Sequence, residues 1–148
     1  MSEALAVQQL FIYGNLMSYF DNPIAYVLER NCQMVGKGTI PGKLHFIQND
    51  FPGAVFDENA SSLVYGQIFS IDPESYQLVM RLLDRYHSFD EGNLSQSLFT
   101  KAVLEIQSEG YRVPCWTYLY NQSVDQLPQI ESGNYWQFLK ENNLHKKQ

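Results

Sequence analysis

The sequence predicts an α+β fold, a small mixed β-barrel that is closed or nearly closed and has short flanking helices. Ten Tyr and nine Phe raise the aromatic share to 14%, which favours strands. Apolar, strand-like runs alternate with short helical segments, and glycines interrupt these runs as in a curling sheet. The length suits one core, so residues 1–148 are expected to form a single domain with its core at about 9–139 and loose termini.

The first predicted strand ends in a glycine turn. Residues 10–13 read as a buried strand, and Gly14 and Asn15 follow at once. Such a turn presents backbone N–H groups with little side chain in the way, which suits an anion or oxyanion pocket. The simpler alternative is that Gly14 only lets the strand turn. Because a small closed sheet can hold one ligand at its mouth, Tyr13 and Gly14 are candidate rim residues.

Three short helices are expected. An Asn-Pro pair, a capping side chain before a first-turn proline, opens the segment 22–31. An Asp-Pro pair repeats this signal before the segment 72–86, where apolar residues recur at intervals of three and four. The third helix, around residues 135–139, is aromatic and is expected to pack on its own domain.

The remaining strands are predicted from apolar runs bounded by Gly, Pro, Asn and Ser. They are one or two glycine-bent strands within 34–47, a loop at 48–53, a short strand at 54–56, a strand at 63–71, and a hairpin of residues 98–106 and 111–120. These strands and helices suggest a sheet that closes or nearly closes, with the glycine turn of the first strand at the rim of its mouth.

Composition excludes several classes of function. The net charge is -6 and the basic residues cluster only at Lys146-Lys147, which argues against a nucleic-acid partner. Cys32 and Cys115 form no metal or redox motif, so we expect two reduced thiols, no metal and no cofactor. The start of the chain has no targeting pattern and no apolar run nears the roughly 18 residues of a membrane span, which predicts a cytoplasmic protein without a membrane partner. No pattern specifies an oligomeric state.

Few side chains are candidates for catalysis. The sequence contains no nucleophile elbow, phosphate-binding loop or zinc-protease motif. His45 is expected to alternate out of a strand, and His145 lies in the tail, so neither is a site candidate. A titratable cluster follows the second helix: Asp84, His87, Asp90 and Glu91. His87 either serves chemistry or simply complements the helix dipole as a cation.

The order of motifs resembles that of the gamma-glutamylcyclotransferase family, which includes the AIG2-like proteins. That family opens on Tyr-Gly-Ser/Thr-Leu, matched here by Tyr13-Gly14-Asn15-Leu16. Further matches are Gly42-Lys43-Leu44, Phe51-Pro52-Gly53-Ala54-Val55, Val64-Tyr65-Gly66-Gln67-Ile68-Phe69, Leu83-Asp84, Cys115-Trp116-Thr117-Tyr118 and the segment from Ile130 to Tyr135. The resemblance covers about residues 10 to 136, nearly the whole chain.

The resemblance implies an intramolecular reaction on a small γ-glutamyl or amino-acid-like molecule. The α-amino nitrogen of a γ-glutamyl amine attacks its own side-chain carbonyl, and 5-oxoproline and a free amine are formed. The resemblance implies this transferase or lyase chemistry without a cofactor. Because nucleophile and electrophile share one molecule, the protein mainly has to fold the substrate and manage protons. The resemblance also assigns substrate binding to Tyr13, Gly14, Asn15, Leu16 and Tyr118.

The sequence departs from the family at the proton-transfer position. The family's catalytic Glu lies in a Leu-Asp-x-x-Glu-Gly pattern, and His87 stands in its place. Asn15 replaces Ser or Thr, and Phe99 replaces a common Tyr. Three hypotheses follow: His87 is the base, Glu91 reaches the site from the next loop, or a catalytically impaired pocket binds its ligand or a partner without turnover.

Overall fold

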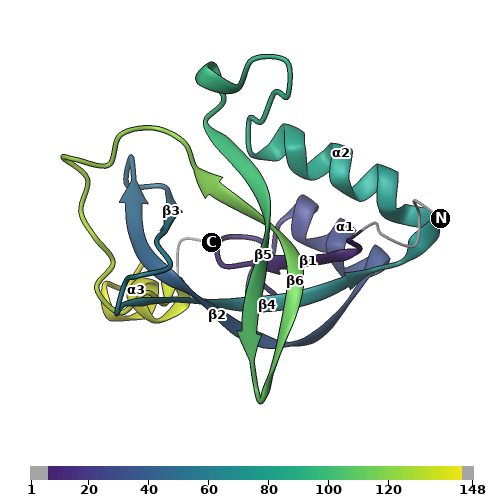
Figure 1. Ribbon diagram of the computed structural model, residues 1–148, viewed down its shortest axis with the longest axis horizontal. Coiled ribbons are helices and arrows are strands. Elements are labelled where there is room, and N and C mark those ends of the chain that lie inside the picture. The colour runs from purple at the N-terminus through teal and green to yellow at the C-terminus, as the bar shows by residue number, and fades with distance from the viewer. Residues whose placement is uncertain (1–6, 145–148) are drawn as a thin grey trace.

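The computed structural model describes residues 7–144. Five strands form a barrel in the order β2-β4-β1-β6-β5, and β5 closes it by pairing with β2 at Thr39 and Gln107. Their bounds are β1 (Gln9–Ile12), β2 (Cys32–Ile47), β4 (Leu63–Ile71), β5 (Phe99–Ser108) and β6 (Tyr111–Tyr120). An additional strand, β3 (Phe51–Phe56), pairs with β2 outside the closed ring (Figure 1). The predicted α+β fold with a closed mixed barrel is confirmed.

The glycine-bent segment is one long strand that serves two neighbours. Residues 32–41 of β2 pair with β4, and residues 42–47 pair with β3. The change of partner falls at Gly42, which has a φ of +151°. A Cβ at this position would lie 2.2 Å from the carbonyl oxygen of Val55, so only glycine lets the two strands approach here.

Strand β1 runs through the centre of the sheet. It is antiparallel to β4 and parallel to β6, with Leu10 opposite Trp116 and Phe11 opposite Thr117. Leu10 and Phe11 are almost completely buried. Because β1 and β6 run in the same direction, the residues that follow β1 reach the same end of the barrel as Tyr118.

Three helices flank the barrel. They are α1 (Pro23–Asn31), α2 (Tyr76–Tyr86) and α3 (Tyr135–Glu141), with α1 and α2 on one side and α3 on the other (Figure 1). The Asn22 carboxamide oxygen accepts a hydrogen bond from the Ala25 amide at 2.9 Å, which confirms the predicted cap of α1. The second prediction was wrong in detail: Asp72 makes no side-chain capping bond, because Pro73–Ser75 form a 3-10 turn before α2 begins.

The predicted loop at 48–53 was too long. Strand β3 already begins at Phe51, which pairs with Ile47, and Pro52 pairs with Phe46. Proline lacks the N–H that a central strand needs, but β3 lies at the edge of the sheet, where that donor can be absent.

The prediction for His45 was also wrong. His45 is 8% exposed, and its Nδ1 lies 3.4 Å from the carbonyl oxygen of Leu127. The long connection after β6 covers this part of β2, where His45 and Gln129 form an isolated bridge. A strand face that alternation predicts to be exposed is thus covered by a distant segment. His145 lies outside the described residues.

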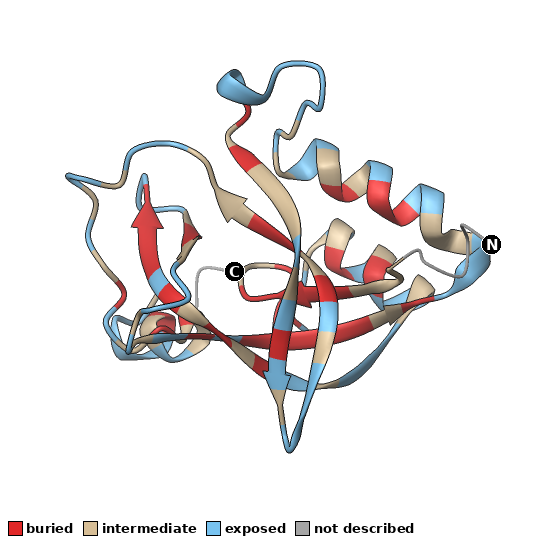
Figure 2. Ribbon diagram, in the orientation of Figure 1, coloured by how far each residue is buried: buried red, intermediate tan, exposed pale blue. Residues whose placement is uncertain are grey.

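The core fills the barrel and the faces of the helices that turn toward it (Figure 2). The predicted packing of the C-terminal aromatic segment is confirmed, since Tyr135 is buried and Trp136 stacks on Tyr19 with ring centroids 5.0 Å apart. Cys32 is half-buried and Cys115 buried, both are free thiols, and burial raises the pKa of each to about 12. Within residues 7–144, no helix is long and apolar enough to cross a membrane.

Candidate functional site

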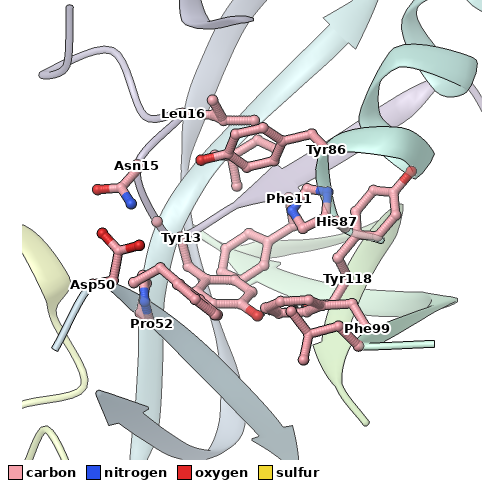
Figure 3. Close-up of a pocket in the computed structure, with 14 residues that line it drawn as sticks. Phe11, Tyr13, Asn15, Leu16, Asp50, Pro52, Tyr86, His87, Phe99 and Tyr118 are labelled. Carbon is pink, nitrogen blue, oxygen red and sulfur yellow. Dashed lines mark hydrogen bonds between the residues drawn. The ribbon is translucent and has the colours of Figure 1, made fainter. Parts of the chain in front are cut away.

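A cavity of about 280 Å³ opens at the end of the barrel where β1 stops. Its walls come from the turn after β1, the β2–β3 turn, the end of α2 and the strands β5 and β6 (Figure 3). All four residues of the turn, Tyr13 to Leu16, line it together with His87 and Tyr118. Six of the seven residues proposed from the sequence therefore surround one space large enough for an amino-acid-sized ligand.

Gly14 is needed for close packing at this wall. The residue does not adopt a positive φ. A Cβ on Gly14 would lie 3.0 Å from Cγ of Pro52, tighter than an ordinary contact. The missing side chain thus lets β3 approach the turn, and the turn is tied to α1 because the Asn22 side chain donates to the Asn15 carbonyl oxygen at 2.9 Å.

Tyr13 braces the site with its hydroxyl. The hydroxyl donates to the carbonyl oxygen of Tyr118 at 2.7 Å and accepts from the Ala54 amide at 3.1 Å. Burial raises the pKa of Tyr13 far above its ordinary value. The phenol therefore stays neutral and links β1, β3 and β6, so the ring forms cavity wall while the hydroxyl is engaged by backbone.

His87 follows the last residue of α2. Its Nδ1 lies 2.8 Å from the carbonyl oxygen of Leu83, so Nδ1 carries the hydrogen and Nε2 is left as an acceptor. The imidazole lies flat on the Tyr118 ring, with centroids 3.9 Å and planes 5° apart, and meets the edge of Phe99. Burial lowers the pKa of His87 to about 4. The side chain is neutral at pH 7, which removes the cation that a helix-dipole role requires.

Asp84 reaches the opposite edge of the same tyrosine. The Tyr118 hydroxyl donates to Asp84 Oδ1 at 2.5 Å, and Lys101 Nζ pairs with that carboxylate at 3.0 Å. Lys101 also stands over the Trp116 ring. Burial, followed by the neighbouring carboxylate, raises the pKa of Tyr118. Asp84 and His87 thus meet on Tyr118, one at its hydroxyl and one at its ring face.

Glu91 is placed elsewhere by the structure. It is exposed in the loop after α2 and does not line the cavity. The loop is organised by its own bonds: the Asp90 amide donates to the Ser97 hydroxyl at 2.8 Å, and the Gly92 amide donates to Asp90 Oδ1 at 3.0 Å. Nothing in this arrangement turns Glu91 toward His87.

Asp50 is a cavity residue that the sequence reasoning missed. It ends the tight turn between β2 and β3, in which Gln48 and Asn49 have φ values of 54° and 56°. Residues 48–50 separate Ile47 from Phe51, the pair at which β2 and β3 meet. The sequence offered only a weak signal, a polar Gln-Asn-Asp stretch before Phe51.

Tyr86 also lines the cavity and was not proposed from the sequence. Burial raises its pKa, an interaction with the Asn15 side chain opposes that rise, and the Asp50 charge adds to it. Asn15 Oδ1 is buried and has no hydrogen-bond partner in the part of the chain that the structure describes. Buried polar atoms without partners are uncommon, and this oxygen can accept a hydrogen bond from a molecule in the cavity.

Metal chemistry receives no support from side-chain placement. Among residues 7–144, no group of three or more His, Cys, Asp or Glu is arranged to hold a metal ion. The polar groups of the cavity are a carboxylate, a neutral imidazole, phenols, an amide and backbone. Such groups can bind and orient an amino-acid-like molecule and transfer protons.

The gamma-glutamyl cyclotransferase, AIG2-like family model matches residues 10–137. The chain belongs to this family. The match includes the turn after β1, the end of α2 and the β6 segment that carries Tyr118. The family resemblance predicted from the sequence motifs is therefore confirmed, and the cavity described above lies inside the matched region.

Solved structures share the fold of this family member. YkqA from Bacillus subtilis has a TM-score of 0.67 at 18% identity, and the match covers 93% of this chain and 43% of YkqA. An AIG2-like protein from Mus musculus has a TM-score of 0.64 at 20% identity, and the match covers 84% of this chain and 86% of the mouse protein. YtfP from Escherichia coli has a TM-score of 0.60 at 24% identity, and the match covers 86% of this chain and 95% of YtfP. The chain thus spans less than half of YkqA, and a search of curated protein sequences found no match.

Proposed function

We propose that this protein binds a γ-glutamyl amine in the cavity and cyclises it to 5-oxoproline with release of the free amine. One observation carries the proposal. The turn Tyr13–Leu16 and His87, which stand at the family's substrate-binding and proton-transfer positions, line the same cavity. Family membership over residues 10–137 supports the reaction class.

The reaction needs positioning and proton transfer. The α-nitrogen of the substrate forms a bond to its side-chain carbonyl carbon, and the bond from that carbon to the leaving nitrogen breaks. The α-ammonium gives up two protons overall and the leaving nitrogen gains two, so no proton is consumed. Because the reaction is intramolecular, folding the substrate into a ring-like conformation accounts for much of the rate. Backbone N–H groups of the Gly14 turn are the proposed donors to the substrate carboxylate or the developing oxyanion.

His87 is the first candidate for the proton-transfer group. With Nδ1–H bonded to Leu83, Nε2 is the nitrogen that can accept a proton. A pKa of about 4 makes it a weaker base at pH 7 than an ordinary imidazole, so slow turnover is expected. Glu91 remains the second candidate, and it needs a movement of the loop to reach the cavity.

Ligand binding without turnover is the alternative function. It is favoured by the same imidazole, which replaces the family's Glu and is held neutral between Tyr118, Phe99 and Leu83. Such a protein would retain a γ-glutamyl or amino-acid-like ligand, or present the site to a partner.

A single experiment separates these functions. The purified protein is incubated with a panel of γ-glutamyl amines and peptides, and 5-oxoproline is quantified while ligand binding is measured in parallel. Release above the buffer rate supports the enzyme. Saturable binding with no release rejects the enzyme and supports the binding protein, and the absence of both leaves the interaction function.

Matched variants then identify the base. His87→Ala and Glu91→Ala remove the two candidates one at a time. Loss of a proton-transfer group typically lowers the rate by roughly two to four orders of magnitude. An unimpaired His87→Ala protein would reject His87 as the base, and an unimpaired Glu91→Ala protein would reject Glu91.

A further inference from the structure

The described lining of the cavity has a negative charge and no opposing cation. Its residues include no Lys or Arg, and Asp50 is the one carboxylate among them. The one imidazole, His87, is neutral at pH 7 because burial lowers its pKa to about 4. A concave site lined by a single sign of charge attracts ligand groups of the other sign. The cavity therefore favours a ligand that carries a cationic group.

Hydrogen bonds fix the backbone of Asp50 but not its side chain. Its amide donates to the carbonyl oxygen of Ile47 at 2.9 Å, and its own carbonyl oxygen lies 3.5 Å from the Tyr135 hydroxyl, which donates to it. The carboxylate makes no hydrogen bond or ion pair with any residue between 7 and 144. Asp50 is exposed to solvent and also lines the cavity, so its carboxylate is available to a ligand that enters there.

The position of Asp50 is selected by the turn that carries it. Gln48 and Asn49 both have positive φ, a conformation that residues other than glycine adopt at some cost. The turn of residues 48–50 puts Asp50 immediately before β3, beside Asn15 and across the cavity from His87 and Tyr118 (Figure 3). The carboxylate and the Asn15 amide form one polar end of a cavity whose other walls are largely aromatic.

We propose that Asp50 binds the α-ammonium group of the ligand and thereby makes the pocket select molecules with a free amino group. This inference rests on the proposed function, because a γ-glutamyl compound carries such an ammonium. An ammonium offers three N–H donors, and an ionised carboxylate accepts them with charge assistance. The inference concerns the ligand as it is first bound, because cyclisation requires the same nitrogen to leave this ion pair and give up its protons.

The test uses two probes that differ only in the amino group: L-glutamine and its des-amino analogue glutaramate. Their affinities are measured by titration calorimetry for the wild-type protein, Asp50→Asn, Asp50→Ala and the control Asp125→Asn. Asp125 is exposed and lies outside the cavity lining, so its substitution changes net charge by the same amount. Circular dichroism and thermal melting establish that each variant is folded.

The wild-type protein is expected to bind L-glutamine about tenfold or more tightly than glutaramate, the effect of one charged hydrogen-bonded pair. Both Asp50 variants are expected to lose this preference by weakening only the binding of L-glutamine, while Asp125→Asn keeps it. Retention of the preference in folded Asp50 variants would overturn the inference, as would equal or absent binding of both probes by the wild-type protein. Release of 5-oxoproline from γ-glutamyl amines is assayed separately. It decides whether the proposed function stands even if the inference about Asp50 fails.

Discussion

The imidazole of His87 lies flat against the ring of Tyr118, with a centroid separation of 3.9 Å and an angle of 5° between the planes. The same tyrosine is anchored at its hydroxyl by Asp84, which is paired with Lys101. His87 is fixed at its other side by the carbonyl oxygen of Leu83. The orientation of the imidazole thus depends on a chain of contacts from α2 to β6 and β5.

Replacing Tyr118 by Phe keeps the stacked ring and removes the bond to Asp84. The half-buried carboxylate then has Lys101 as its remaining partner, so unfolding free energy is expected to fall by about 1–2 kcal/mol. Urea denaturation measures this loss. Tyr111→Phe, the same change at an exposed residue of β6, serves as the control and is expected to have little effect. Equal stability of the two variants would show that the Asp84 bond contributes nothing.

Gly14→Ala is expected to disturb the cavity wall. The new methyl group would lie 3.0 Å from Cγ of Pro52, so β3 or the turn must shift, at a cost of about 1–3 kcal/mol typical of overpacking. Ligand affinity should fall as well, because this turn lines the site. Gly36→Ala is the matched control, since its nearest atom would be Ser108 Oγ at 3.8 Å. A Gly14→Ala protein as stable as Gly36→Ala would contradict the packing explanation.

His87 makes stability depend on pH in a defined direction. Its pKa is about 4 in the folded protein and about 6.5 when unfolded, so the unfolded state binds the proton more readily. The contribution is intact above the unfolded value and is lost as the pH falls from about 6.5 toward 4, amounting to about 2 kcal/mol between pH 7 and pH 5. Urea denaturation of the wild-type protein and His87→Gln at these two pH values measures it. Parallel pH dependence in the two proteins would exclude His87 as the source.

Restoring the family's residue with His87→Glu tests whether the rest of the cavity can support catalysis. If the Gly14 turn and the substrate orientation are intact, release of 5-oxoproline is expected to rise by at least about tenfold, because general acid–base groups contribute roughly two to four orders of magnitude. His87→Gln is the control, because the Gln side chain has the shape of Glu but carries no titratable carboxylate. Unchanged, negligible release with a folded His87→Glu protein would count against a latent cyclotransferase site.

The two predicted helix caps that precede a proline, Asn22 and Asp72, are expected to differ in their contribution to stability. Asn22→Ala removes the cap of α1 and the bond to the Asn15 carbonyl oxygen, and is expected to cost about 1–2 kcal/mol. Asp72→Ala should change stability by less than about 0.5 kcal/mol, because the Asp72 side chain makes no capping bond. Thermal unfolding of both variants makes the comparison, and a larger loss for Asp72→Ala would contradict the observed cap geometry.

The helices and most strands were predictable because their signals are local. The Asn22-Pro23 pair marks the start of α1, and the apolar run 63–71 coincides with β4. The errors arose where a distant segment decides the environment. His45 has the alternation of an exposed strand residue, yet the connection through Leu127 covers it. Pro52 suggested a loop, yet the edge position of β3 accommodates it.

The sequence by itself determined the family motifs, and the resemblance predicted that His87 stands at a position where the family pattern has Glu, since both depend only on the order of residues along the chain. Barrel closure decided which residues line the cavity. It brought the turn after β1, the β2–β3 turn and the end of α2 around one cavity, and thereby exposed Asp50 to it while leaving Glu91 outside. The pKa of His87 was likewise decided by packing, because burial against Tyr118 and Phe99 disfavours the charged imidazole that its ordinary pKa would allow.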